Sequence, residues 1–287
     1  MNLNHTNTTF IIVTYKSEFI IHECLKTLPN DYNKIIIENS GNIKLKENLE
    51  SKYDNLQVFI SDNLGMGASN NVGIKKCNTD FAFVINPDIK FKENTLEELV
   101  KAVSLIDNFA ILSPISSDPK FPNYVSSKKS FLTENIISVD RIDGYSMLIN
   151  KKRFKDNQYF DINFFMYLEN DDLCLKKKKE NENLYIIKKS IIEHLGGKSS
   201  DIIFKEEIEL SRNWHWMWSK FYFNKKHYGL LFALRMSLGN FITSFLKYFF
   251  YLIIFNNIKK NNYKMRLSGI FNAVIGKTSW YRPNIKY

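Results

Sequence analysis

The sequence has few cysteines, few glycines and few prolines. Its three cysteines, Cys24, Cys77 and Cys174, are far apart and form no Cys-x-x-Cys pair. That spacing argues against a disulfide framework and a structural zinc site, and it is typical of a reducing cytosol. With 11 glycines, 6 prolines and 44% hydrophobic residues among 287, wholesale disorder is not expected. Residues 1–5 lack a basic stretch leading into an apolar core, so no signal peptide is expected.

Acidic residues are scarce in the last third of the chain. Residues 205–287 contain 14 Lys/Arg against 3 Asp/Glu, a balance of +11, whereas residues 1–204 have a balance of −1. A neutral body followed by a basic segment indicates that the segment meets something anionic. We therefore predict two domains, residues 1–204 and residues 205–287.

Apolar runs alternate with helical patterns along the first domain. Strands are predicted at residues 10–15, 34–37, 56–60, 81–85 and 145–149, with short β-like runs at 184–187 and 190–193. Helices are predicted at residues 18–28, 93–106 and 173–180, a surface excursion at 114–135, and strand or loop at 160–167. This alternation predicts an α/β fold with a mainly parallel sheet flanked by helices.

Polar residues follow the run at 81–85, where the strand must end. Pro87 lacks an N–H, so Asn86 and Asp88 are expected on the loop at the strand's carboxyl end, where open α/β sheets bind ligands. Asp88 could instead merely cap a turn. His194 also follows an apolar run, and together with Asp88 it could hold a divalent cation. For a lone histidine, a structural hydrogen-bonding role is the alternative.

Two further segments carry possible chemistry. Gly65 and Gly67 could let backbone N–H groups approach an anion, although a plain helix-entry loop explains them equally well. The acidic run 169–172 could be structural, because Asn170 is a favourable N-cap and acids complement the first turn of a helix. Beside the aromatic strip 164–167, however, carboxylates can have raised pKa values and act as bases, and we favour that interpretation.

Taken in order, these segments resemble a family 2 glycosyltransferase with the GT-A fold. They are most similar to the bacterial rhamnosyltransferase-like branch that builds surface polysaccharides. The matching segments are Val13–Ser17, Ile37–Ser40, Asn63–Gly73, Asn86–Asp88, Phe160–Cys174 and His194–Gly197, with a looser match over Gly269–Arg282. Each motif is weak alone, but six in this order make a specific pattern.

The resemblance implies a donor site and a metal. The implied donor-binding residues are Thr14, Tyr15, Glu38, Asn63, Gly65, Asn71, Asn86 and Asp88. Glu38 stands where the family usually has Asp. Asp88 and His194 would hold Mg²⁺ or Mn²⁺, and the donor would be dTDP-rhamnose or a UDP-sugar.

The family's Glu-Asp-x-Asp motif falls on residues 169–172, with Asn170 at the position of the usual base. An amide cannot take a proton at neutral pH, so we favour Glu169 as the base, with Asp171 close behind. A shifted register or a weakly active chain are alternatives. The implied reaction is inverting transfer of a hexose, rhamnose first, to a glycan or lipid-linked glycan in capsule or lipopolysaccharide synthesis. A non-catalytic nucleotide-sugar-binding or assembly subunit and a nucleotidyltransferase-like enzyme are the alternatives.

The basic second domain contains a long apolar stretch at residues 228–255. Arg235 and Lys247 interrupt it, and its longest charge-free runs have eleven residues, short of the roughly 20 that a spanning helix needs. We predict an amphipathic helix in the membrane interface, at the cytoplasmic face of the cell membrane. Packing on the first domain or on a second subunit is the alternative. Nucleic acid is not expected as a partner, because the apolar face is too broad.

Overall fold

The computed structural model describes residues 3–127, 130–196 and 204–283. The chain divides into two compact units. The sheet unit comprises residues 1–161 and 170–200, and the helical unit comprises residues 162–169 and 201–287. The predicted division after residue 204 adjoins residues 197–203, which lie outside the described residues, and it stays a prediction. Gly197, at the end of one matching segment, lies there too.

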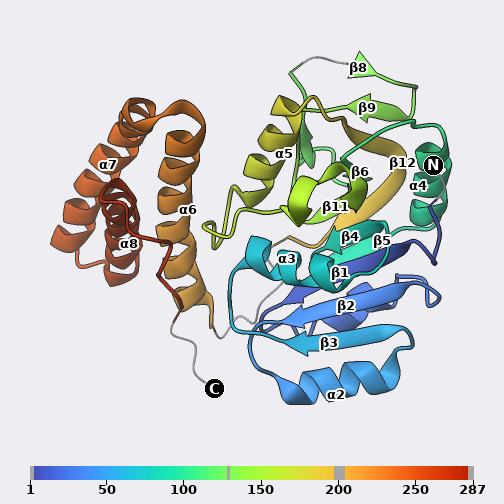
Figure 1. The fold of residues 1–287 in the computed structure, drawn as a ribbon. Helices are drawn as coiled ribbons and strands as arrows, with labels where there is room; N and C mark the ends of the chain where they lie inside the picture. Colours follow the sequence, from blue (N-terminus) through green and yellow to red (C-terminus); the bar gives the residue numbers. More distant parts are fainter. Residues whose placement is uncertain (1–2, 128–129, 197–203, 284–287) are drawn as a thin grey trace. The chain divides into compact units, whose positions relative to one another are not determined.

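A single large sheet organises the sheet unit (Figure 1). Among the described residues it has ten strands, in the order β3-β2-β1-β4-β11-β6-β12-β9-β8, with β5 paired to β12. Its strands are β1 (Thr8–Thr14), β2 (Asn33–Glu38), β3 (Leu56–Ile60), β4 (Phe81–Ile85), β5 (Ile89–Phe91), β6 (Ile111–Ser116), β8 (Ser130–Phe131), β9 (Ile136–Ser138), β11 (Ser146–Asn150) and β12 (Leu184–His194). The short strands β7 (Tyr124–Val125) and β10 (Arg141–Ile142) pair separately.

Most long strands run in one direction. Strands β3, β2, β1 and β4 are parallel neighbours, and β6 and β12 run the same way, because β11 is antiparallel to both β4 and β6. Strand β1 is central, since Ile12 pairs with Ile36 on one side and Ile85 on the other. The prediction of a mainly parallel α/β sheet is confirmed.

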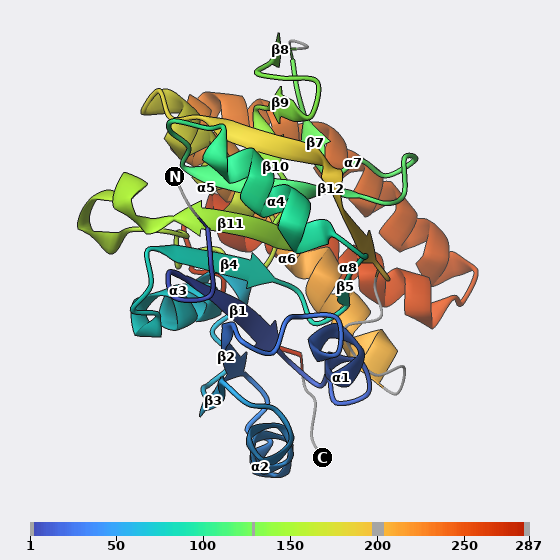
Figure 2. The ribbon, with the colours of Figure 1, turned by 90° about the vertical axis from the view of Figure 1, so that its right-hand side faces the viewer.

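Alternate side chains of the strands enter two separate cores, as the pleat requires. Phe10 and Ile12 face the core with helices α1 (Ile21–Leu25), α2 (Ile43–Lys52) and α4 (Thr95–Ser104). Their neighbours in β1, Ile11 and Val13, face the other core, which receives side chains from α3 (Met66–Lys76) and α5 (Glu169–Lys179). Figure 2 shows α4 lying along the sheet beside β12.

Several sequence-based boundaries are wrong in informative ways. The two short β-like runs near residue 190 are one strand, β12, with a register shift between Ile187 and Ile191. The segment 160–167, predicted as strand or loop, is loop. The excursion predicted at 114–135 begins inside strand β6 and contains β7 and β8. The helix predicted over 18–28 is only five residues long. Two short 3₁₀ turns, Lys151–Arg153 and Lys155–Asn157, follow β11.

The helical unit is built from α6 (Lys205–Tyr228), α7 (Leu230–Ile253) and α8 (Asn257–Val274). Gly229 joins α6 to α7 with a φ of 90°, a conformation that favours glycine. The small core of the helical unit contains Trp214, Trp218 and Ala273. The predicted C-terminal amphipathic helical region is confirmed. Among the helices in the described ranges, none has the length and apolar character needed to cross a membrane.

Candidate active site

The carboxyl ends of the parallel strands are level with one another. Thr14 at the end of β1 pairs with Glu38 at the end of β2, and Glu38 in turn pairs with Ile60 of β3. The turns that follow are tied together by backbone bonds, from Asn39 N–H to the Thr14 carbonyl (2.9 Å) and from Ser61 N–H to the Glu38 carbonyl (2.9 Å). One polar edge results, which is the ligand-binding edge of such sheets.

Asp88 lies at this edge beside His194. The side chain of Asp88 is buried, at 2% exposure, and its Oδ2 lies 3.4 Å from His194 Nε2. Strand pairing explains the contact. Ile89, directly after Asp88, pairs with His194 in the β5–β12 ladder, and Leu195 N–H donates to the Asp88 carbonyl at 3.1 Å. Two residues 106 positions apart in the chain therefore share one place.

The surroundings of Asp88 fit a cation. Its Oδ1 is buried without a hydrogen-bond partner, and no Lys or Arg pairs with the carboxylate in the described part of the chain. Burying a carboxylate that no positive charge neutralises is unfavourable in free energy, and a bound cation supplies the missing charge. Carboxylate oxygen and imidazole nitrogen are both suitable ligands for a divalent metal. Burial and the nearby Asp88 charge together raise the pKa of the Cys24 thiol to about 12, so Cys24 is no thiolate ligand.

Protein groups alone do not complete a metal site. Across residues 3–127, 130–196 and 204–283, no cluster of three or more His, Cys, Asp or Glu side chains is placed to hold a metal. A Mg²⁺ site commonly has only one or two protein ligands, the others being water and substrate phosphate oxygens. That Asp88 and His194 hold a metal stays a prediction.

Tyr145 fixes the ring of His194. The two rings stack with centroids 4.0 Å apart and an interplanar angle of 26°. The Tyr145 carbonyl accepts a hydrogen bond from Asn86 N–H at 3.0 Å, which joins the start of β11 to the end of β4. Burial raises the pKa of Tyr145 to about 12, so its phenol stays protonated.

Other predicted donor residues line the same edge. Thr14 Oγ1 and Asn86 Oδ1 are buried and have no hydrogen-bond partner in the described residues. Tyr15 and Asn63 are half-buried in the loops after β1 and β3. Lys16, between Tyr15 and Ser17, has a φ of 54° and is buried. Unsatisfied buried polar atoms are rare in proteins, so Thr14 and Asn86 are groups that a ligand could satisfy.

Glu38 contacts the turn that follows it. Its carboxylate accepts hydrogen bonds from Ser40 N–H at 3.0 Å and from Asn42 N–H at 2.7 Å, and the Ser40 hydroxyl donates to it as well. The residue is fully buried. These contacts give Glu38 a structural task in shaping the turn; whether it also contacts a donor stays a prediction.

The glycine-containing segment allows α3 to pack closely against the sheet. A Cβ on Gly73 would lie 2.4 Å from Ile11 Cγ2, so only glycine permits this approach. Gly65 precedes the helix with a φ of 91°. The side-chain amide of Asn71 donates to the Phe160 carbonyl at 2.7 Å and accepts from Phe160 N–H at 2.9 Å. Asn71 therefore clamps the backbone before the acidic segment.

Asp171 belongs to a charged group at the turn between β10 and β11. Arg141 lies between two carboxylates, with Nη1 2.9 Å from Asp171 and Nη2 3.6 Å from Asp143. Burial raises the pKa of both aspartates, and the positive charge of Arg141 opposes the shift. The charge of His194 also opposes the rise in the pKa of Asp143. Charge interactions at this turn therefore extend from His194, through Asp143 and Arg141, to Asp171.

Asn170 points to the backbone. The helix α5 begins at Glu169, and the Asn170 amide donates to the Ile142 carbonyl at 3.0 Å, so the N-cap interpretation is wrong. A Cβ on Gly144 would lie 3.2 Å from Asn170 Cβ, which shows how closely the two elements pack. Asp172 is buried within the same turn of helix. Asn170 thus holds the acidic helix start against the β10–β11 turn.

The segment before α5 groups with the helical unit. The ring of Phe165 packs against that of His215 in a tilted arrangement, with centroids 4.5 Å apart, and the Ser219 hydroxyl donates to the Met166 carbonyl at 2.7 Å. Tyr167 and Leu168 both have a positive φ (70° and 67°), a conformation costing about 1–3 kcal/mol per residue that concentrates at functional sites. Glu169 ends this segment. Of the two predicted catalytic carboxylates, only Asp171 lies in the same unit as Asp88 and His194.

Sequence reasoning missed Arg141, Asp143 and Tyr145. They surround the turn into β11, where the sequence predicts only a strand over residues 145–149. Strand β11 runs antiparallel to β4, and its first residue, Ser146, pairs with Ile85, so its beginning reaches the edge where β4 ends. The available signal was an Asp-Gly pair directly before an apolar run, together with a charged residue on each side of Ile142.

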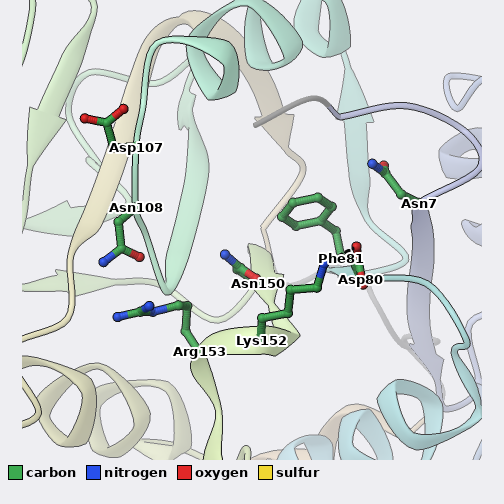
Figure 3. A pocket seen from close by; sticks show the side chains of 8 residues that line it. All are labelled: Asn7, Asp80, Phe81, Asp107, Asn108, Asn150, Lys152 and Arg153. Carbon is green, nitrogen blue, oxygen red and sulfur yellow. Dashed lines mark hydrogen bonds and ion pairs between the residues drawn. The ribbon is translucent and has the colours of Figure 1, made fainter.

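A cavity of about 580 Å³ lies at the opposite edge of the sheet (Figure 3). It is lined by Asn7, Asp80, Phe81, Asp107, Asn108, Asn150, Lys152 and Arg153. Phe81 begins β4 and Asn150 ends the antiparallel β11, which places the cavity at the amino ends of the parallel strands. Lys152 is paired there with Asp80 at 2.7 Å. None of the predicted site residues lines this cavity.

The mostly parallel sheet, with helices packed against both of its faces, is a GT-A type fold. Solved structures share the fold. The Pyrobaculum calidifontis mannosyltransferase PcManGT, bound to GDP-Man and Mn²⁺, superimposes with a TM-score of 0.54 at 10% identity over 93% of this chain and 87% of that chain. S. aureus TarS 1–349 gives a TM-score of 0.51 at 15% identity over 96% and 93%.

The family model "Glycosyl transferase family 2" matches residues 9–173, and the chain belongs to that family. The hexosyltransferase Agl10 of Haloferax volcanii is 25% identical over 196 residues, 61% of this chain and 63% of Agl10. The rhamnosyltransferase WbbL of Escherichia coli is 26% identical over 208 residues, 62% of this chain and 79% of WbbL. The match thus spans just under two thirds of Agl10. The predicted family and fold are confirmed.

Proposed function

We propose that this chain is an inverting, metal-dependent hexosyltransferase that moves a sugar from a nucleotide-sugar donor to a glycan or lipid-linked glycan. The observation that carries the proposal is the arrangement at the carboxyl edge of the sheet. A buried aspartate with an unsatisfied oxygen lies beside a histidine, and the turn packed on that histidine carries Arg141, which holds Asp171. A cation site for the donor diphosphate, with a base nearby, is what sugar transfer needs.

The donor we favour is dTDP-rhamnose, with a UDP-sugar as the second choice. Similarity to a protein named rhamnosyltransferase supports rhamnose, and similarity to one named hexosyltransferase supports the wider class. Structures with the same fold hold GDP-Man and UDP-GlcNAc. We assign donor binding to Thr14, Tyr15, Glu38, Asn63, Gly65, Asn71, Asn86 and Asp88.

Asp88 and His194 would hold Mg²⁺ or Mn²⁺. The fit rests on the buried, unpartnered Asp88 Oδ1 and on the 3.4 Å approach of His194 Nε2. A bound divalent cation supplies charge neutralisation for the departing nucleotide diphosphate. Tyr145 holds the imidazole ring at the angle set by stacking, so the histidine needs little reorganisation to serve as a ligand.

Asp171 is the base that we favour over Glu169. In the proposed step, the acceptor hydroxyl gives its proton to the Asp171 carboxylate, and its oxygen forms a bond to the anomeric carbon. The bond between that carbon and the diphosphate oxygen breaks in line, so the configuration inverts. The raised pKa of Asp171 makes it a stronger proton acceptor, and Arg141 orients it.

The acceptor and the location complete the proposal. We place the reaction in capsule or lipopolysaccharide synthesis, at the inner face of the cell membrane, with the chain bound peripherally and with homo-oligomer formation open. Similarity to WbbL and the basic, aromatic second domain support this assignment.

Transfer assays with a panel of donors test the function. With Mn²⁺ present, release of nucleotide diphosphate and labelling of an acceptor are expected for one donor, dTDP-rhamnose first. A non-catalytic nucleotide-sugar-binding subunit is the second candidate, favoured by Asn170 at the usual base position. That candidate predicts a thermal shift with a nucleotide sugar but neither hydrolysis nor transfer with any donor.

A further inference from the structure

Helix α7 exposes most of its apolar side chains. Fourteen of its large apolar residues are exposed, with Leu231 at 83% and Ile253 at 72%, and Phe255 just beyond the helix is 88% exposed. Only Ala233, Ser237 and Ser244 are buried. A helix on a water-facing surface shows the opposite pattern, with large apolar residues inward. Contiguous apolar surface of this extent marks an interaction site.

The inward strip of α7 explains why the large residues remain outside. Ala233, Ser237 and Ser244 follow helical spacing and face α6 and α8, which lie beside α7 (Figure 1). The core of the helical unit is filled mainly by α6 and α8, which approach closely: a Cβ on Gly269 would lie 2.3 Å from the Trp214 carbonyl oxygen. The apolar surface of α7 is therefore not needed for the fold of this unit.

The charged and small residues that interrupt the apolar sequence of α7 do not face inward. Arg235, Gly239, Thr243 and Lys247 are all exposed, so they border or interrupt the apolar surface. Both cations have long aliphatic stems, which can lie on an apolar surface while the charge reaches polar surroundings.

Charge around α7 has one sign. Residues 210–283 contain twelve Lys/Arg and no Asp or Glu. Where α7 meets α8, cations lie over aromatic rings: Lys247 Nζ is 5.4 Å from the Tyr263 centroid, and Lys259 Nζ is 5.3 Å from the Tyr251 centroid. Aromatic rings and lysines are the groups that gather at the headgroup level of a bilayer.

We propose that the outer face of α7 docks on an anionic lipid bilayer, with the helix along the membrane surface and its apolar side chains at the headgroup–acyl boundary. The proposed function already includes peripheral membrane binding; the site on α7 deepens that part of it and rests on it, whereas vesicle flotation tests the site independently of sugar transfer. The charge of this surface favours a bilayer over a second copy of the chain. In a two-fold dimer the same basic surface, which lacks acidic residues, would face itself and repel, whereas anionic headgroups complement it. Apolar burial and electrostatic attraction then act together.

Flotation of the full chain with vesicles tests the proposal. The probes are phosphatidylcholine vesicles with and without phosphatidylglycerol. The native chain is expected to bind the anionic vesicles, and more weakly at high salt. The double variant Leu231→Glu/Leu238→Glu should lose at least about tenfold in binding. Leu105→Glu, at an equally exposed leucine of the sheet unit, is the matched control and should bind like the native chain.

A second pair of variants separates charge from apolar burial. Lys247→Gln and Lys259→Gln should each lower binding to anionic vesicles about fivefold and leave binding to neutral vesicles unchanged. If the glutamate variant does not fold, Leu231→Ser/Ile253→Ser replaces it, with a circular dichroism melt as the check. Equal vesicle binding by native chain and α7 variants overturns the proposal. A second outcome also overturns the proposal. In it the native chain does not bind vesicles but sediments as a lipid-free dimer, and the Leu231→Glu/Leu238→Glu variant sediments as a monomer.

Discussion

The sheet unit and the helical unit use apolar residues in opposite ways. In the sheet unit every residue of β1 and β4 is buried, and the charged residues of the first domain nearly cancel. In the helical unit the longest apolar helix turns its large side chains outward among basic residues. The sheet unit thus buries its apolar strands, whereas the helical unit leaves the large apolar side chains of α7 exposed.

The strongest expected effect concerns the edge of the sheet unit. Asp88→Asn should lower the rate of sugar transfer about 10⁴-fold, because the leaving diphosphate loses its cation. The melting temperature should stay equal or rise, since the substitution removes a buried, uncompensated charge. Asp107→Asn, an exposed residue at the opposite edge, is the control and should be fully active. A loss of activity together with a large loss of stability would assign Asp88 a structural role.

Replacing the base should have the next largest effect. Asp171→Asn is expected to reduce kcat/KM about 10³-fold with donor binding unchanged, and Glu169→Gln should cost far less. Steady-state transfer kinetics and donor titration of the two variants provide the comparison. If Glu169→Gln lowers kcat/KM more than Asp171→Asn does, the base is Glu169, the residue favoured from the sequence.

The pH profile tests the same residue. Burial raises the pKa of Asp171, so kcat/KM should rise with pH through a value above that of an ordinary aspartate. Because the folded chain binds this proton more tightly than the unfolded chain, stability contributed by the group should fall as pH rises between the unfolded and the raised folded pKa. The pH dependence of kcat/KM and that of stability should both be absent in Asp171→Asn. If the pH profile of kcat/KM is unchanged by the substitution, Asp171 is not the titrating group.

Truncating one phenylalanine in each unit sharpens the contrast. Phe83→Ala, in the buried strand β4, should destabilise the sheet unit by about 3–5 kcal/mol. Phe249→Ala, 44% exposed on α7, should change the free energy of unfolding by less than about 0.5 kcal/mol in water. Urea denaturation followed by circular dichroism measures both. Similar losses would mean that the outer face of α7 is covered in solution.

The smallest expected change concerns the second metal ligand. His194→Gln should weaken Mn²⁺ binding in the presence of a nucleotide diphosphate about 10–100-fold, because Asp88 and the phosphates remain. Electron paramagnetic resonance titration of free Mn²⁺ gives the affinity. An unchanged affinity would make His194 a structural partner of Tyr145.

The sequence was sufficient for the frame of the sheet unit. Strands β3 and β4 begin and end at the predicted residues, because short apolar runs bounded by polar turns have few alternatives. The proximity of Asp88 and His194 was also predictable, since Asp88 follows β4 and His194 ends β12, and both strands belong to one sheet. The long strand β12 was split in two because Lys188 and Lys189 interrupt its apolar pattern at the register shift.

Other features depend on tertiary contacts that no local pattern reveals. Arg141 and Asp143 reach the site only because β11 reverses direction beside β4. The N-cap role, which the sequence offered as an alternative for Asn170, is wrong, because the Asn170 amide donates to a carbonyl 28 residues away in the chain. For α7, helical spacing predicted a helix correctly, but which side faces inward was decided by close packing on α6 and α8, where small side chains fit.

Calorimetric titration of dTDP, with and without Mn²⁺, tests the central claim most directly, since it needs neither the correct sugar nor the acceptor. Native chain and Asp107→Asn are expected to bind the nucleotide tightly only with Mn²⁺, and Asp88→Asn should lose the difference made by the metal. Equal binding by all three proteins, regardless of Mn²⁺, would contradict a cation-assisted diphosphate site at the carboxyl edge of the sheet.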